Sequence, residues 1–225
     1  MKTYEQSESR ALTQVWPAVA LALAGVWLAG CHTTVYQQGD RAAASSRAAA
    51  TELQTQSQAL EGTTATLSNL VYKLAPDLKP QFQSFSAALD GLAAAARQGG
   101  VTGSHLERSN ALYFAAWDKQ LTTITNADVR SRSEARKTEV SNQFTAAHTQ
   151  YVQAQAALWS QVDYLQDIRK ALTADLTTSG VEAAKPLVST ASASASKVQT
   201  SLTQARTDLM ALSAAMSSAG GPSGQ

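Results

Sequence analysis

The residue of this 225-residue chain best placed for chemistry is its single cysteine, Cys31. It follows Leu28-Ala29-Gly30, where an apolar stretch from Val15 to Ala29 ends and the small residue Gly30 marks a candidate cleavage site. Secretory signals combine a positively charged start, an apolar stretch of roughly 7–15 residues and a cleavage site of small residues. The pattern predicts cleavage between Gly30 and Cys31, which would make Cys31 the first residue of the mature protein.

The sequence Leu28-Ala29-Gly30-Cys31 resembles the lipobox of bacterial lipoproteins. This resemblance implies that residues 1–30 form a lipoprotein signal peptide and that the Cys31 thiol is acylated. An uncleaved transmembrane anchor is the alternative, but it needs roughly 20 apolar residues, and His32-Thr33-Thr34 ends this stretch too early. In enteric-type sorting an Asp after the cysteine retains a lipoprotein at the inner membrane. His32 therefore favours the periplasmic face of the outer membrane.

Charge and cysteine content narrow the function of the rest of the chain. The full sequence holds 18 Lys and Arg against 17 Asp and Glu, a formal net charge of +1, and residues 1–30 account for two of each kind. Nucleic-acid binding calls for a strongly basic face, so no nucleic-acid partner is expected. Without a second cysteine the chain has no internal disulfide, and packing alone must hold it together.

The pattern of residues predicts an all-α protein. Ala, Ser, Thr, Gln and Leu dominate, and no run alternates apolar and polar residues as a strand would. Apolar residues recur at steps of three and four, and short turns favour antiparallel neighbours. We expect a tether over residues 31–40, an elongated, coiled-coil-like antiparallel bundle over 41–217 and a disordered tail over 218–225.

Five helices are expected within this bundle. Gly99-Gly100 ends the second helix, a loop covers 99–104, and the third helix starts near His105. A kink or restart is expected at Asn126–Asp128, because both residues favour helix caps. The last helix should begin between Val181 and Pro186, since proline is tolerated only in a first turn.

Three stretches carry a second resemblance: Leu112-Tyr113-Phe114-Ala115-Ala116-Trp117-Asp118-Lys119-Gln120-Leu121, Asn126-Ala127-Asp128-Val129-Arg130 and Gln161-Val162-Asp163-Tyr164-Leu165. They are similar to a family of uncharacterised bacterial helical lipoproteins, catalogued as a domain of unknown function. Some members carry a loose "DNA repair ATPase" label. The resemblance covers roughly residues 50–217 and implies the fold and the anchor, but no activity.

Residues that could perform catalysis are scattered. The glycine-rich segment 99–104 lacks the lysine of a phosphate-binding loop, so no nucleotide is expected. His32, His105 and His148 lie far apart and have no second ligand at helical spacing, so no metal is expected. There is no Gly-x-Ser-x-Gly elbow around a serine nucleophile. The sequence thus predicts a protein that is not an enzyme and holds no cofactor.

The densest charges are Arg130, Arg132, Arg136 and Lys137, interleaved with Glu134 and Glu139. One interpretation is a solvated helix start with ion pairs at helical spacing. The other is a docking patch for an anionic partner: a lipid head group, a cell-wall polymer or an acidic protein. Nearby, Tyr113 and Trp117 should pack inward, whereas Phe114 lies one residue off that stripe and could mark a second contact face.

These observations favour a non-enzymatic, membrane-anchored envelope lipoprotein. Its bundle would act as a spacer, an adaptor to a protein partner or a self-association unit. A periplasmic binding protein that holds a lipid or a cell-wall component between its helices is the second hypothesis. A hydrolase with an unrecognised site is the third.

Overall fold

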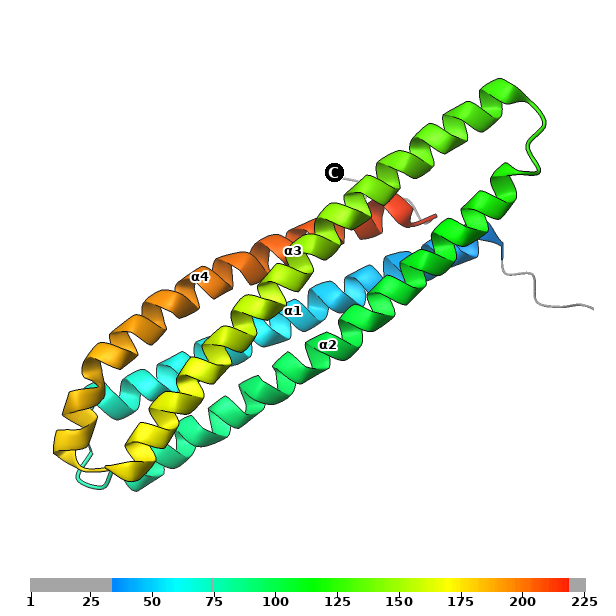
Figure 1. Ribbon diagram of the computed structural model, residues 1–225. Coiled ribbons are helices and arrows are strands. Elements are labelled where there is room, and N and C mark those ends of the chain that lie inside the picture. Colours follow the sequence, from blue (N-terminus) through cyan, green and yellow to red (C-terminus); the bar gives the residue numbers. More distant parts are fainter. Residues whose placement is uncertain (1–33, 74, 219–225) are drawn as a thin grey trace, which may run out of the picture. The chain divides into compact units, whose positions relative to one another are not determined.

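The computed structural model describes residues 34–73 and 75–218, and over these it forms four helices without strands (Figure 1). The helices are α1 (Val35–Tyr72), α2 (Lys79–Leu121), α3 (Ala127–Ala174) and α4 (Thr178–Met216). The predicted all-α class is confirmed. The predicted signal peptide, Cys31 and residues 219–225 of the predicted tail lie outside the described residues.

The four helices form an antiparallel bundle in which chain neighbours are also neighbours in space. α1 packs against α2 and α4, and α3 packs against the same two helices. Helices of 38 to 48 residues are about 57 to 72 Å long at 1.5 Å per residue. Nowhere in the described part of the chain is a helix apolar over a stretch long enough to cross a membrane.

The core is a continuous apolar seam along the bundle axis. On α1, the predicted sevenfold series of Leu53, Leu60 and Leu67 is fully buried, and so are Leu165 on α3 and Leu209 on α4. Burying a large apolar side chain stabilises the fold by about 1.5–3 kcal/mol. The seam therefore supplies most of the stability, as the spacing of apolar residues predicts.

The predicted loop at residues 99–104 is wrong, because α2 runs through it without a break. Gly99 is a glycine for a packing reason: a Cβ atom there would lie 2.3 Å from the Gln155 side-chain oxygen. Gly103 has a similar cause, because a Cβ atom would lie 2.9 Å from the Tyr151 ring. These glycines let side chains of α3 approach the α2 backbone. The five predicted helices are therefore four.

The predicted tether is also wrong over residues 35–40, which already belong to α1. The side chain of Gln37 reaches back to accept a hydrogen bond from the Thr34 N–H at 3.0 Å, which caps the helix. Gly39 lies against the Tyr113 ring and the Met216 carbonyl, each 3.1 Å from the position of an added Cβ atom. Tertiary packing therefore extends the helix towards Cys31.

The last helix starts earlier than predicted. The Thr177 side chain accepts a hydrogen bond from the Gly180 N–H at 3.1 Å, and α4 begins at Thr178. Pro186 consequently lies inside the helix rather than in its first turn. The buried residues on either side of it, Val181, Ala184 and Val188, hold this part of α4 against the core.

Candidate functional site

The two ends of the bundle differ in construction. At one end, here called the proximal end, α1 begins, α2 turns into α3, and α4 ends (Figure 1). Asp40 and Ser218 join α1 to the end of α4, because the Ser218 N–H donates to Asp40 at 2.8 Å. This bond lowers the pKa of Asp40. At the other, distal end lie the connections of α1 to α2 and of α3 to α4.

The α2–α3 hairpin reaches beyond the other two helices at the proximal end (Figure 1). We define residues 117–133 as the hairpin tip. Asn126 caps α3 there, as predicted, by accepting a hydrogen bond from the Val129 N–H at 3.1 Å. The Trp117 indole N–H donates to the Ser133 hydroxyl at 3.0 Å and joins the two helices. The tip is thus held by its own hydrogen bonds.

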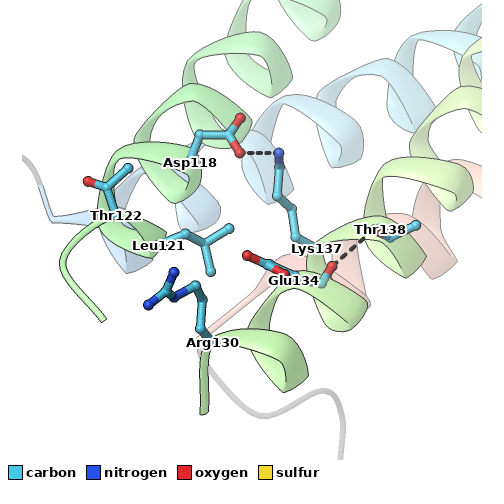
Figure 2. A pocket seen from close by; sticks show the side chains of 7 residues that line it. All are labelled: Asp118, Leu121, Thr122, Arg130, Glu134, Lys137 and Thr138. Carbon is cyan, nitrogen blue, oxygen red and sulfur yellow. Dashed lines mark hydrogen bonds and ion pairs between the residues drawn. The ribbon is translucent and has the colours of Figure 1, made fainter. Parts of the chain in front are cut away.

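An open cleft of about 480 Å³ lies against the tip between α2 and α3 (Figure 2). Its walls carry two acidic and two basic side chains, together with two threonines and a leucine: Asp118, Glu134, Arg130, Lys137, Thr122, Thr138 and Leu121. Asp118 and Lys137 form an ion pair across it, which joins α2 to α3. The mixture of signs gives the cleft little net charge.

The four predicted patch residues do not form one surface. Lys137 is held in its ion pair with Asp118. Arg136 pairs with Glu139 at 2.7 Å and donates to the Ala215 carbonyl at 3.2 Å, near the end of α4. Such a cation also stabilises the negative end of a helix dipole. Both residues therefore have structural partners within the chain, but only the Arg136–Glu139 pair has the helical spacing that the solvated-helix interpretation expects.

Arg130 and Arg132 are the exposed remainder of this patch, and they lie in the hairpin tip. The Arg130 Nε donates to the Ile124 carbonyl at 3.0 Å, which fixes the root of its guanidinium group. The other nitrogens of that group stay available for an anion. Val129, between the loop and these arginines, is 55 % exposed.

The aromatic side chains near the tip mostly face the protein. Tyr113 is buried, with its ring 5.3 Å from that of Trp117, which agrees with the predicted inward stripe. Phe114 packs on Phe144 of α3 at 6.0 Å, and Phe144 stacks on His148 at 5.5 Å. The predicted second contact face at Phe114 is therefore used for packing between α2 and α3.

A group of polar residues crosses the middle of the bundle, and we call it the central polar layer: Glu52, Gln56, Gly99, Tyr151 and Gln155. The Gln56 amide donates to the Ala95 carbonyl at 3.2 Å and exchanges hydrogen bonds with Gln155. The Tyr151 hydroxyl donates to the Gly99 carbonyl at 2.6 Å. The layer links α1, α2 and α3 through the core.

Burial shifts the two acidic groups of this layer. It raises the pKa of Glu52, an effect that the Gln56 side chain partly offsets, and one Glu52 oxygen is buried without a hydrogen-bond partner. Burial, reinforced by the Glu52 charge, also raises the pKa of the Tyr151 hydroxyl above its usual range. Tyr151 therefore remains a hydrogen-bond donor at physiological pH. Its bond to a backbone carbonyl serves packing.

The sequence carried a signal for this layer that the apolar pattern hid. Positions 53, 56, 60, 63 and 67 follow the core spacing of α1, and two of them hold Gln56 and Thr63. Both polar side chains are buried, and each donates to a carbonyl of α2: Gln56 to Ala95 and Thr63 to Ala88. A polar residue at a core position of a helix predicts a hydrogen bond to a neighbouring helix.

The residues that could hold a metal stay apart. His105 is exposed and His148 half-buried, on different helices, and His32 lies outside the described residues. Within residues 34–73 and 75–218, no three His, Cys, Asp or Glu side chains gather as metal ligands would.

Comparison of the sequence with family models gives no match, and neither do comparisons with curated proteins and with solved structures.

Proposed function

We propose that this chain is a non-enzymatic envelope lipoprotein, anchored through an acylated Cys31 to the periplasmic face of the outer membrane. Its helical bundle acts as a spacer and adaptor, which engages a protein partner or a second copy away from the membrane. The resemblance of Leu28-Ala29-Gly30-Cys31 to a lipobox supports the anchor.

The position of α1 relative to Cys31 carries this proposal. Thr34, the cap of α1, lies three positions after Cys31, and a helix of 38 residues follows without interruption. A lipid on Cys31 would therefore attach almost directly to a rod about 57 Å long. Because only residues 32 and 33 separate Cys31 from the cap of α1, a lipid there would keep the start of the rod close to the membrane.

The interior of the bundle supports a structural role. The central polar layer uses its donors on carbonyls and amides of its own chain, as a network that fixes helix register would. A lipid or a cell-wall component held between the helices is the second hypothesis. It has less support, because leucine, valine and alanine side chains fill the bundle axis.

Membrane fractionation of cells that express Cys31→Ser tests the anchor. We expect wild type in the outer-membrane fraction with the mass of an acylated chain, and the variant as an unprocessed or soluble protein. A Cys31→Ser variant that fractionates and migrates like wild type would refute the anchor. His32→Asp is the matched control, since it keeps the cysteine and should move the protein to the inner membrane.

In-cell cross-linking then tests the adaptor role. A dominant cross-linked partner that is lost in Cys31→Ser is the expected result for an adaptor at the membrane. Cross-links between copies of the chain would instead support self-association. Neither kind of cross-link, together with a lipid extracted from the purified protein, would favour the binding-protein hypothesis.

A further inference from the structure

We propose that the hairpin tip, residues 117–133, rests on the membrane that holds the anchor and binds anionic phospholipid head groups through Arg130 and Arg132. This inference rests on the proposed function, because it takes the lipid on Cys31 as the fixed point. It gives the anchored bundle a second contact with the membrane and so orients it.

The tip and the anchor can extend to the same level at the proximal end of the bundle. Tyr113 packs on Gly39, so these two residues share a level along the bundle. From that level, α2 continues to Leu121, about 12 Å further, whereas α1 extends only about 6 Å to Val35. From Thr34 to Cys31 an extended chain spans at most about 10 Å. The tip and the anchor can therefore meet one membrane surface.

The hairpin tip carries more basic than acidic side chains. Between Asp118 and Lys137 the chain holds five basic and three acidic side chains. Asp118 and Lys137 neutralise each other, and Arg136 is engaged with Glu139 and the end of α4. Lys119, Arg130 and Arg132 then outnumber Asp128 and the neighbouring Glu134, which leaves an excess of positive charge at the tip. A basic side chain close to an anionic bilayer is attracted to its surface.

Apolar and aromatic side chains are exposed at the same end of the bundle. Val129 is 55 % exposed at the tip, and Tyr36 in the first turn of α1 is 60 % exposed. Apolar and tyrosine side chains favour the boundary between head groups and acyl chains. The connection between α2 and α3 is short and Asn126 caps α3, so the first turns of α3 that carry Val129 and the arginines are held in place.

A fluorescent label at Val129→Cys in the full-length protein tests the contact. Acylation blocks Cys31, so an environment-sensitive dye such as NBD labels only the introduced thiol. The purified protein is placed in phosphatidylcholine–phosphatidylglycerol vesicles that carry a nitroxide on a fraction of the head groups. We expect a blue-shifted emission that the nitroxide quenches. Ser179→Cys at the distal end is the matched control and should emit as it does in water.

Charge reversal separates the arginine contact from simple proximity. Arg130→Glu with Arg132→Glu should abolish the quenching at position 129. Lys197→Glu with Arg206→Glu, an equal change on exposed positions of α4, should leave it unchanged. Equal emission in water and in vesicles at position 129 would overturn the inference, and so would quenching that the tip reversal leaves intact.

The mass of the purified protein separates failure of this inference from failure of the proposed function. An acylated Cys31 with an unquenched tip label overturns only the membrane contact of the tip. An unmodified Cys31 overturns the anchor, and the tip inference falls with it. Quenching at position 129 with an acylated Cys31 supports both.

Discussion

The proximal and distal halves of the bundle differ in the size of the residues that α1 buries, although one continuous apolar seam runs through both. In the proximal half of α1 the buried residues are small: Gly39, Ala42, Ala43, Ser45, Ser46, Ala49 and Ala50. In the distal half they are mostly large: Leu53, Gln56, Leu60, Thr63, Leu67, Leu70 and Val71. The central polar layer lies near the boundary between the two.

Small residues let helices approach closely, but they remove little apolar area from water. The proximal half therefore depends on large side chains from other helices, such as Tyr113, Leu209 and Leu212. We therefore expect the proximal end, which we propose to face the membrane, to be the less stable end of the rod. An anchor and a membrane contact at that end would supply the support that its own packing lacks.

The largest expected effect comes from truncating a core leucine in either half. Leu165→Ala in the distal half and Leu209→Ala in the proximal half should each lower the free energy of unfolding by about 2–5 kcal/mol. Chemical denaturation measures both. Leu112→Ala is the control, because Leu112 is 54 % exposed and its loss should change stability by less than about 0.5 kcal/mol.

Hydrogen exchange on the same variants sharpens the comparison. Leu209 lies on α4 one turn before Ser213, whose hydroxyl accepts a hydrogen bond from Arg47 of α1. Truncation of Leu209 should therefore speed amide exchange selectively over residues 42–50. Leu165→Ala should speed exchange throughout the bundle. Uniform exchange in both variants would show that the two halves unfold as one unit, which would contradict a difference in stability between them.

The next effect in size tests the boundary between the halves. Gly99→Ala would place a Cβ atom 2.4 Å from the Gln56 amide nitrogen and displace buried hydrogen bonds, at a cost of about 1–3 kcal/mol. A gain of about 0.5–1 kcal/mol in helix propensity offsets part of this cost. Thermal or chemical unfolding should therefore show a net loss of stability.

Gly100→Ala is the matched control, one residue further along the same helix. Nothing lies within 4 Å of a Cβ atom there, so only the gain in helix propensity remains. We expect this variant to be more stable than wild type. If Gly99→Ala were stabilising as well, the polar layer would be too adaptable to fix the register of the helices.

This pair of glycines also shows how far the sequence could lead. The spacing of leucines along each helix predicted the core, because helical periodicity is a local property. Gly99-Gly100 resembled a turn for an equally local reason. The reason for a glycine at position 99 is the packing of Gln155, which is distant in sequence and close only in the folded bundle.

The partners of the charge cluster are distant in sequence in the same way. Arg136 and Lys137 belong with Arg130 and Arg132 by spacing, and local charge pairs explain only the bond to Glu139. The partner of Lys137 lies on α2 and the second partner of Arg136 on α4. The sequence locates the charged segment, and the tertiary contacts show which of its basic side chains have partners on other helices.

The smallest expected effect concerns Glu52, the charged member of the central polar layer. Because burial raises its pKa, the folded protein binds this proton more tightly than the unfolded chain does. The contribution to stability is therefore fully present below the unfolded pKa of this group and is lost as the pH rises through the folded pKa. Glu52→Gln, which carries no charge, should flatten this dependence and be more stable than wild type at neutral pH.

Denaturation midpoints measured from roughly pH 4 to 7 would reveal the difference. Glu61→Gln is the control, since Glu61 is an exposed glutamate of the same helix. A larger benefit from Glu61→Gln than from Glu52→Gln would locate the cost of charge outside the layer. A larger gain in stability from Glu52→Gln than from Glu61→Gln is the expected result. It would show that the Glu52 charge lowers the stability of the fold beside Tyr151, at the boundary between the small-residue half and the leucine-rich half of the rod.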